Sequence, residues 1–177
     1  MATTLTLAHL VLTPALACVV VSDLLYRRIA NRLLLVLLTF WLLCTCIQLF
    51  QGNLDLASLA IGAGIALAVL IAGYLLFAIH WMGAGDAKLM AVLCLWMADQ
   101  SLLFMMVTAL VGGLLALMLP LVLAIERGIA WALMHIDGWL PRPTVPLPHA
   151  LREQPLPGIP YGLAIAAGAL LVLWGSV

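Results

Sequence analysis

Residues 82–88 have the sequence Met-Gly-Ala-Gly-Asp-Ala-Lys and place a carboxylate, Asp86, and an ammonium, Lys88, between two apolar segments. A charged side chain at membrane depth costs roughly 3 kcal/mol or more unless it faces a bundle interior or water. Asp86 therefore indicates a functional site. The alternative is a tight turn in which a solvated Asp86 caps the following helix. Gly83 and Gly85 would let another backbone, such as an extended substrate, approach the loop closely.

The composition is that of a polytopic membrane protein. Hydrophobic residues make up 67% of the 177 residues and charged residues only 8%, more apolar than a soluble core could bury. Seven basic and seven acidic residues cancel, so nothing electrostatic favours binding to nucleic acid. The cysteines form no CxxC pair and lie in apolar runs, which predicts packing residues rather than a metal or redox site. They are Cys18, Cys44, Cys46 and Cys94.

Six apolar runs have about the length needed to cross the hydrocarbon of a bilayer, which takes roughly 20 helical residues. The sequence therefore predicts an all-α fold of about six transmembrane helices in a single domain over residues 1–177. The fourth run is short, which places Asp86 near a membrane boundary. The runs cover residues 5–24, 32–50, 55–80, 87–98, 101–125 and 159–176.

All seven basic residues fall on one side of these predicted spans. By the positive-inside rule that side is the cytoplasm, so both termini and the links at 51–53 and 99–100 should face outward. Asp23 and Asp86 then lie at the cytoplasmic side at about the same depth. The basic residues are Arg27, Arg28, Arg32, Lys88, Arg127, Arg142 and Arg152.

A long cytoplasmic loop is expected at about residues 126–158. Its first part, 127–140, carries many apolar and few charged side chains, which is typical of an amphipathic helix at headgroup level. The second part is rich in proline, which favours an extended tether. His135 and His149 in this loop are too far apart in sequence to indicate a metal site.

Asp23 ends the first apolar run and is a second candidate for chemistry. Two facing carboxylates can share one proton, so that one acts as a general base on water while the other polarises a carbonyl. The alternative for Asp23 alone is an ion pair with Arg27, four residues later on the same helix.

Three motifs follow one another along the chain: Asp23 followed by Arg27-Arg28-Ile29-Ala30-Asn31, the G-x-G-D-x-K run of residues 83–88, and Ile159-Pro160-Tyr161-Gly162. In this order they resemble the type IV prepilin leader peptidases, membrane aspartic proteases of the GxGD type. The resemblance implies that Asp23 and Asp86 are the catalytic pair. It also implies that the substrate is a prepilin, cut at the cytoplasmic face of the bacterial inner membrane after the glycine that ends its short basic leader.

Two departures from the family pattern are visible. Ala30 stands where the family often has proline, at a position that touches no proposed catalytic group. The cytoplasmic domain with paired CxxC motifs, found in larger members that also N-methylate the trimmed pilin, is absent. The resemblance therefore implies a short, peptidase-only enzyme of the branch that processes Flp or Tad-type pilins.

The hypothesis is direct attack by water activated by Asp23 and Asp86, without a covalent intermediate or a cofactor. Lys88 would either orient and balance the acidic pair or mark the cytoplasmic border. Two other classes stay open, a small proton-coupled transporter and a structural subunit of a pilus or secretion apparatus. A transporter should carry polar residues deep in several spans, and the spans of this sequence are nearly devoid of them. The expected partners are the prepilin leader and helix and the lipid bilayer; a homo-oligomer is left open.

Overall fold

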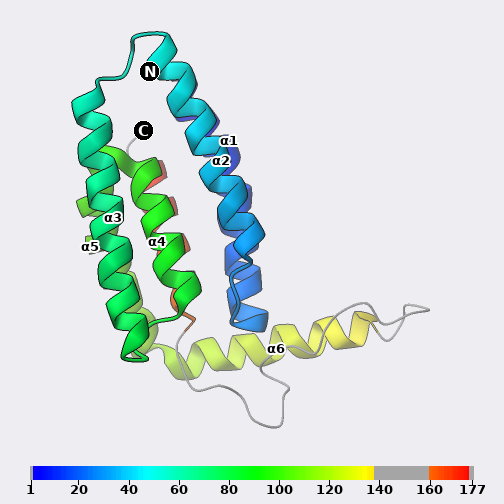
Figure 1. Cartoon of the computed structure of the whole chain (residues 1–177). Helices are drawn as coiled ribbons and strands as arrows, with labels where there is room; N and C mark the ends of the chain where they lie inside the picture. The colour runs from blue at the N-terminus through cyan, green and yellow to red at the C-terminus, as the bar shows by residue number, and fades with distance from the viewer. Residues whose placement is uncertain (1, 138–159, 176–177) are drawn as a thin grey trace.

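The computed structural model describes residues 2–137 and 160–175, and every regular element within these ranges is helical, so the all-α prediction is confirmed. Most helices run side by side along one bundle axis, whereas α6 lies across one end of the bundle (Figure 1). The elements are α1 (Ala2–Tyr26), α2 (Asn31–Phe50), α3 (Leu56–Ala78), α4 (Ala84–Met97), the 3-10 turn η1 (Ala98–Gln100), α5 (Ser101–Leu117), α6 (Leu119–Asp137) and α7 (Tyr161–Gly175).

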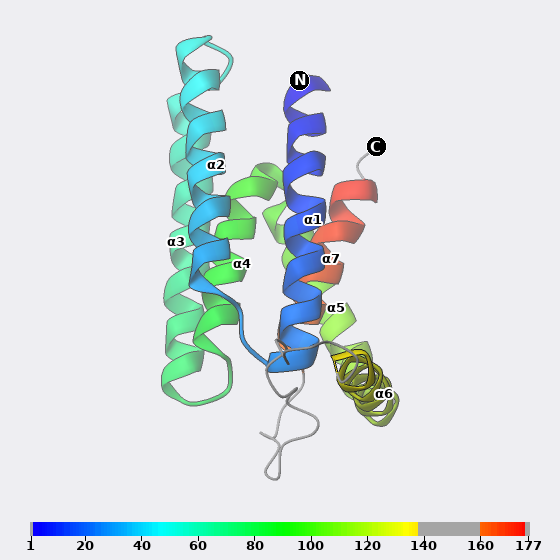
Figure 2. The ribbon, with the colours of Figure 1, turned by 90° about the vertical axis from the view of Figure 1, so that its right-hand side faces the viewer.

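The bundle consists of two groups of helices that meet where α4 packs against α7. In one group α4 packs on α2 and α3, and in the other α7 packs on α1 and α5 (Figure 2). Small residues allow the close approaches, since a Cβ added at Gly73 would lie 2.7 Å from the Cβ of Ala87. Two indole N–H groups also join α2 to α4, because Trp41 donates to the Leu95 carbonyl and Trp96 to the Leu37 carbonyl.

Four helical stretches are long and apolar enough to cross a membrane. The fourth combines α4, η1 and α5, and it is divided at Ala98, whose φ of 44° ends the α4 geometry and lets α5 return alongside the bundle. α7 is a shorter apolar helix. Large apolar side chains cover the outside of the bundle, as expected for a surface in contact with lipid. The stretches are His9–Tyr26, Asn31–Phe50, Leu56–Ala78 and Ala84–Leu117.

The predicted fifth span, 101–125, is wrong from residue 118 onward. α5 ends at Leu117, and the chain turns at Met118 into α6. The cause is Pro120, which has no N–H for the carbonyl four residues earlier and whose ring excludes a continuous helix. The same proline is tolerated in the first turn of the new helix α6.

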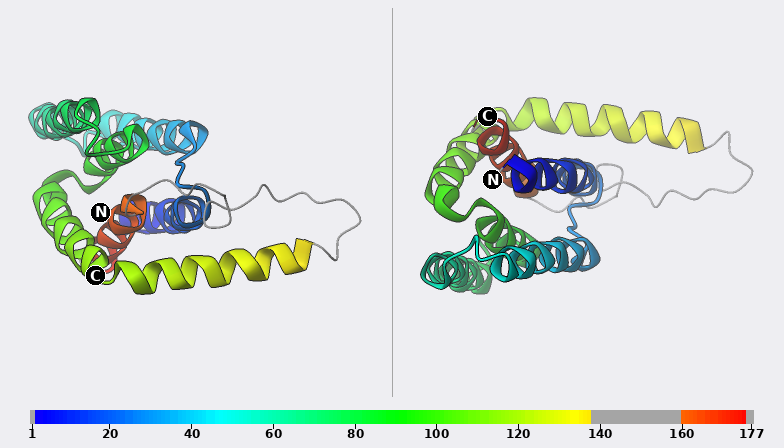
Figure 3. Two further views of the ribbon diagram at one scale, coloured as in Figure 1. Left: turned by 90° about the horizontal axis from the view of Figure 1, so that it is seen from below. Right: turned by 90° about the horizontal axis from the view of Figure 1, so that it is seen from above.

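α6 leaves the bundle beside α5 and passes the end of α1 (Figure 3). Val122, Glu126 and Ala130, spaced by four residues, are buried, whereas Leu121 and Trp131 are exposed. The helix predicted at residues 127–140 is confirmed as far as residue 137, but it forms only the second part of the longer helix α6. The rest of the predicted loop, including its proline-rich part and His149, lies outside the described residues.

The glycines inside the apolar runs divide into two kinds. A Cβ added at Gly112 would lie 3.1 Å from the Tyr161 ring, so this glycine does allow close packing of α5 against the start of α7. Within the described part of the chain, a Cβ at Gly62, Gly64 or Gly113 would meet nothing within 4 Å. These three glycines therefore serve no close helix contact among the described residues.

Candidate active site

Asp23 lies near the end of α1 and is directed at the first turn of α7. Its side chain is buried, and Oδ2 accepts a hydrogen bond of 3.2 Å from the backbone N–H of Leu163. The first N–H groups of a helix have no partner within the helix and favour a negative charge. Gly162 leaves room for the carboxylate, since a Cβ there would lie 2.8 Å from Oδ2. The start of α7 thus holds Asp23 in place.

Asp86 lies in the first turn of α4, and its carboxylate folds back toward the residue that precedes the helix. A Cβ added at Gly83 would lie 2.8 Å from Asp86 Oδ2. At Gly85 an added Cβ would lie 3.2 Å from the Cβ of Ile29, in the link between α1 and α2. Gly83 therefore makes room for the carboxylate, and Gly85 lets the link after α1 approach α4.

The structure brings Asp23 and Asp86 together at the end of the bundle that α6 crosses. They come from helices that are separated by about 60 residues of sequence, yet the Asp23 carboxylate acts electrostatically on that of Asp86. Two carboxylates in such proximity form an arrangement that can share a proton and activate water. The catalytic role of the pair stays a prediction.

Lys88, predicted either to serve the acidic pair or to mark the cytoplasmic border, is directed elsewhere. Its side chain is exposed, and Nζ lies 3.4 Å from Oδ1 of Asn31 at the start of α2. This contact joins α4 to α2. The role of Lys88 stays a prediction.

Sequence reasoning missed Glu126, which is 1% exposed and lies on α6. Its Oε2 forms an ion pair of 2.8 Å with Nη2 of Arg27, whose side chain is 10% exposed. Among the described residues no ion pair joins Arg27 to Asp23, so the local pairing considered from the sequence is not what forms. Its position directly after the apolar residues 119–125 could have indicated a functional acid, because an isolated charge beside an apolar run also pointed to Asp86. The role of Gly162 could not be found in this way, because it depends on contact between α1 and α7.

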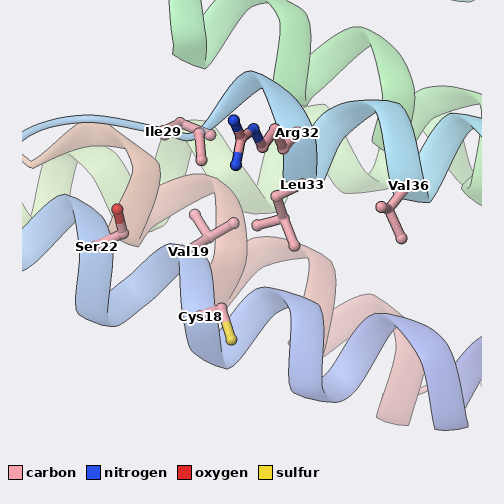
Figure 4. A pocket seen from close by; sticks show the side chains of 8 residues that line it. Cys18, Val19, Ser22, Ile29, Arg32, Leu33 and Val36 are labelled. Atoms are coloured by element: carbon pink, nitrogen blue, oxygen red, sulfur yellow. The ribbon is translucent and has the colours of Figure 1, made fainter.

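An apolar groove of about 400 Å³ opens between α1 and α2 (Figure 4). Val19 of α1 lies opposite Leu33 of α2, and Ser22 and Ile29 lie on facing sides of the groove toward one end (Figure 4). That end adjoins the acids, because Ser22 precedes Asp23 and Ile29 contacts Gly85. The lining residues are Cys18, Val19, Ser22, Ile29, Ala30, Arg32, Leu33 and Val36.

Two adjacent carboxylates at one end of a bundle of apolar helices can activate water for hydrolysis or relay ions across a membrane. Residues 10–121, more than half of the chain, match the model of the type IV leader peptidase family. The chain therefore belongs to this family and is a membrane leader peptidase. Both acids lie within the matched residues, whereas Glu126 and Gly162 lie beyond them. Comparisons with curated proteins and with solved structures find no match.

Proposed function

We propose that this chain is an aspartic endopeptidase of the GxGD type that removes the short basic leader from a prepilin at the cytoplasmic face of the inner membrane. The observation that carries the proposal is the proximity of Asp23 and Asp86 in a member of the leader peptidase family. One ionised carboxylate takes a proton from water while the other, protonated, donates a hydrogen bond to the scissile carbonyl. The water oxygen attacks the carbonyl carbon, and the departing amine takes a proton from the pair.

The experiment that tests this function uses the purified full chain in detergent and a synthetic prepilin that carries its leader. Mass spectrometry of the products should locate a single cut directly after the last leader glycine. A transporter or a structural subunit would leave the prepilin intact under the same conditions. Replacing that glycine by a bulky residue in the substrate provides the matched control.

A Flp or Tad-type pilin is the substrate we propose, and methyl transfer is not part of the activity. Support comes from the absence of any CxxC pair in the sequence, since such pairs mark the extra domain of the methylating members that the chain resembles. Incubating the enzyme with a trimmed pilin and a labelled methyl donor should leave the pilin unlabelled.

The proposed topology has six spans, formed by α1 to α5 and α7, with both termini outside the cytoplasm. Its support is that all seven basic residues fall on one side of these spans and that the acids lie at the same end. α6 would then rest in the headgroup layer, with Leu121 and Trp131 toward lipid.

Cysteine labelling tests this topology in a background with Cys18, Cys44 and Cys46 replaced by alanine. Asn53, between α2 and α3, and His80, after α3, are both exposed in the structure. Asn53→Cys should react with an impermeant maleimide added to intact cells, whereas His80→Cys should react only after the cells are opened. The reverse pattern would put the acids on the outer face and contradict the proposed cut site.

The groove between α1 and α2 is the route we propose for the apolar helix of the prepilin. It opens at membrane depth, because Cys18 and Val36 are exposed, and it ends beside the acids. Leu33→Trp should fill the groove and raise KM roughly tenfold with kcat nearly unchanged. Leu67→Trp, in an equally apolar groove between α2, α3 and α4, is the matched control and should leave KM unchanged. Equal KM values for the two variants would place the substrate elsewhere.

A further inference from the structure

The ion pair between Arg27 and Glu126 lies beside a proposed catalytic carboxylate. Arg27 directly follows α1 with a φ of 52°, and its backbone N–H donates to the Asp23 carbonyl at 3.0 Å. Its guanidinium and the Glu126 carboxylate both act electrostatically on the Asp23 side chain. Asp23 is therefore within the influence of two charges of opposite sign, one of which comes from α6, 99 residues after Arg27 in the sequence.

A buried guanidinium has a strong requirement for a carboxylate partner. Removing one member of a buried ion pair leaves a desolvated charge that the surrounding structure must compensate. If Glu126 carried no charge, the guanidinium of Arg27 could pair instead with the carboxylate of Asp23, four residues earlier in the chain. A pair between Arg27 and Asp23 would be a strong charge-assisted contact, and it would draw the carboxylate away from the N–H of Leu163 and from Asp86.

We propose that Glu126 is a positioning residue that holds the Arg27 guanidinium away from Asp23 and so keeps Asp23 available to act together with Asp86. This inference rests on the proposed function. In it, the local pairing of Asp23 with Arg27, which the sequence favours, is prevented by a tertiary contact from α6. α6 thereby becomes part of the site although it supplies no group that touches the substrate.

Three variants test the proposal: Glu126→Met, Arg27→Met and the double replacement. Glu126→Met removes the carboxylate that holds the guanidinium on the α6 side, so kcat should fall at least about tenfold while KM stays within about twofold. The double variant removes the guanidinium as well and should recover most of the lost kcat. It should also fold, because a buried ion pair can often be replaced by apolar side chains of similar volume without loss of stability.

If the ion pair only fastens α6 to α1, adding Arg27→Met to Glu126→Met should not raise kcat. In that case the double variant would lose both ends of the tether and show a kcat no higher than that of Glu126→Met, which would overturn the proposal. Wild-type kcat in Glu126→Met would overturn it as well. If Glu126→Met does not accumulate, the double variant alone decides, since a folded double variant with kcat far below wild type contradicts the proposal.

The same assays separate this inference from the proposed function. Cleavage by Asp23→Asn or Asp86→Asn would refute the catalytic pair itself. Loss of cleavage in those two variants, together with a folded but inactive double methionine variant, would refute only the role of Glu126. Thermal unfolding in detergent shows which variants are folded.

Discussion

Asp23→Asn and Asp86→Asn should each lower kcat by at least about a thousandfold while the protein accumulates in the membrane at its normal level. An amide has nearly the shape of a carboxylate, and its oxygen can still accept the hydrogen bond from Leu163, so the fold should persist. An amide cannot take a proton from water or exchange one with the other acid. The two groups act as a unit, and the double variant should therefore be no slower than either single variant. Initial rates of prepilin cleavage measure all three.

Asp99→Asn is the matched control for these replacements. Asp99 lies in η1 at the opposite end of α4 from Asp86, and its side chain is exposed. The same chemical change there should leave kcat and KM unaltered. Substantial cleavage by either Asp23→Asn or Asp86→Asn would assign the chemistry to other groups.

The sequence predicted the helices best where apolar runs end at turns. α2 and α3 begin and end within two residues of the predicted runs, because the link at residues 51–55 contains glycine, asparagine and aspartate, which favour a turn. The end of the fifth span was predicted wrongly because a count of apolar residues does not detect a change in helix direction. Pro120 was visible in the sequence and marks that change.

The two acids could be predicted because each is an isolated charge in or beside an apolar run, which needs a physical reason to exist. The groups that hold them could not, because those contacts join distant parts of the chain. Arg27 shows the difference clearly, since its spacing from Asp23 favours a local pair, yet α6 supplies Glu126. Gly85 was expected to face a substrate, and the structure shows that it faces Ile29.

Gly162→Ala should lower kcat about a hundredfold, the scale expected when a reacting group is misplaced by about 1 Å. The new Cβ would lie 2.8 Å from Oδ2, 2.9 Å from Cγ and 3.2 Å from Cβ of Asp23. Because Cβ is fixed to the backbone of α1, rotating the carboxylate does not remove the overlap. Either α1 or α7 must shift, and the hydrogen bond from Leu163 to Asp23 must lengthen.

Two other glycine variants set the scale for this effect. Gly83→Ala would approach Asp86 only at Oδ2 and, at 3.5 Å, at Cγ, so a rotation of the carboxylate can relieve it and the loss should be nearer tenfold. Gly113→Ala lies in the same bundle with open space at its Cβ and should cleave at the wild-type rate. Rates, KM and unfolding temperatures for the three variants distinguish a displaced carboxylate from general instability. If Gly162→Ala folded normally and cleaved at the wild-type rate, the start of α7 would not be what positions Asp23 for catalysis.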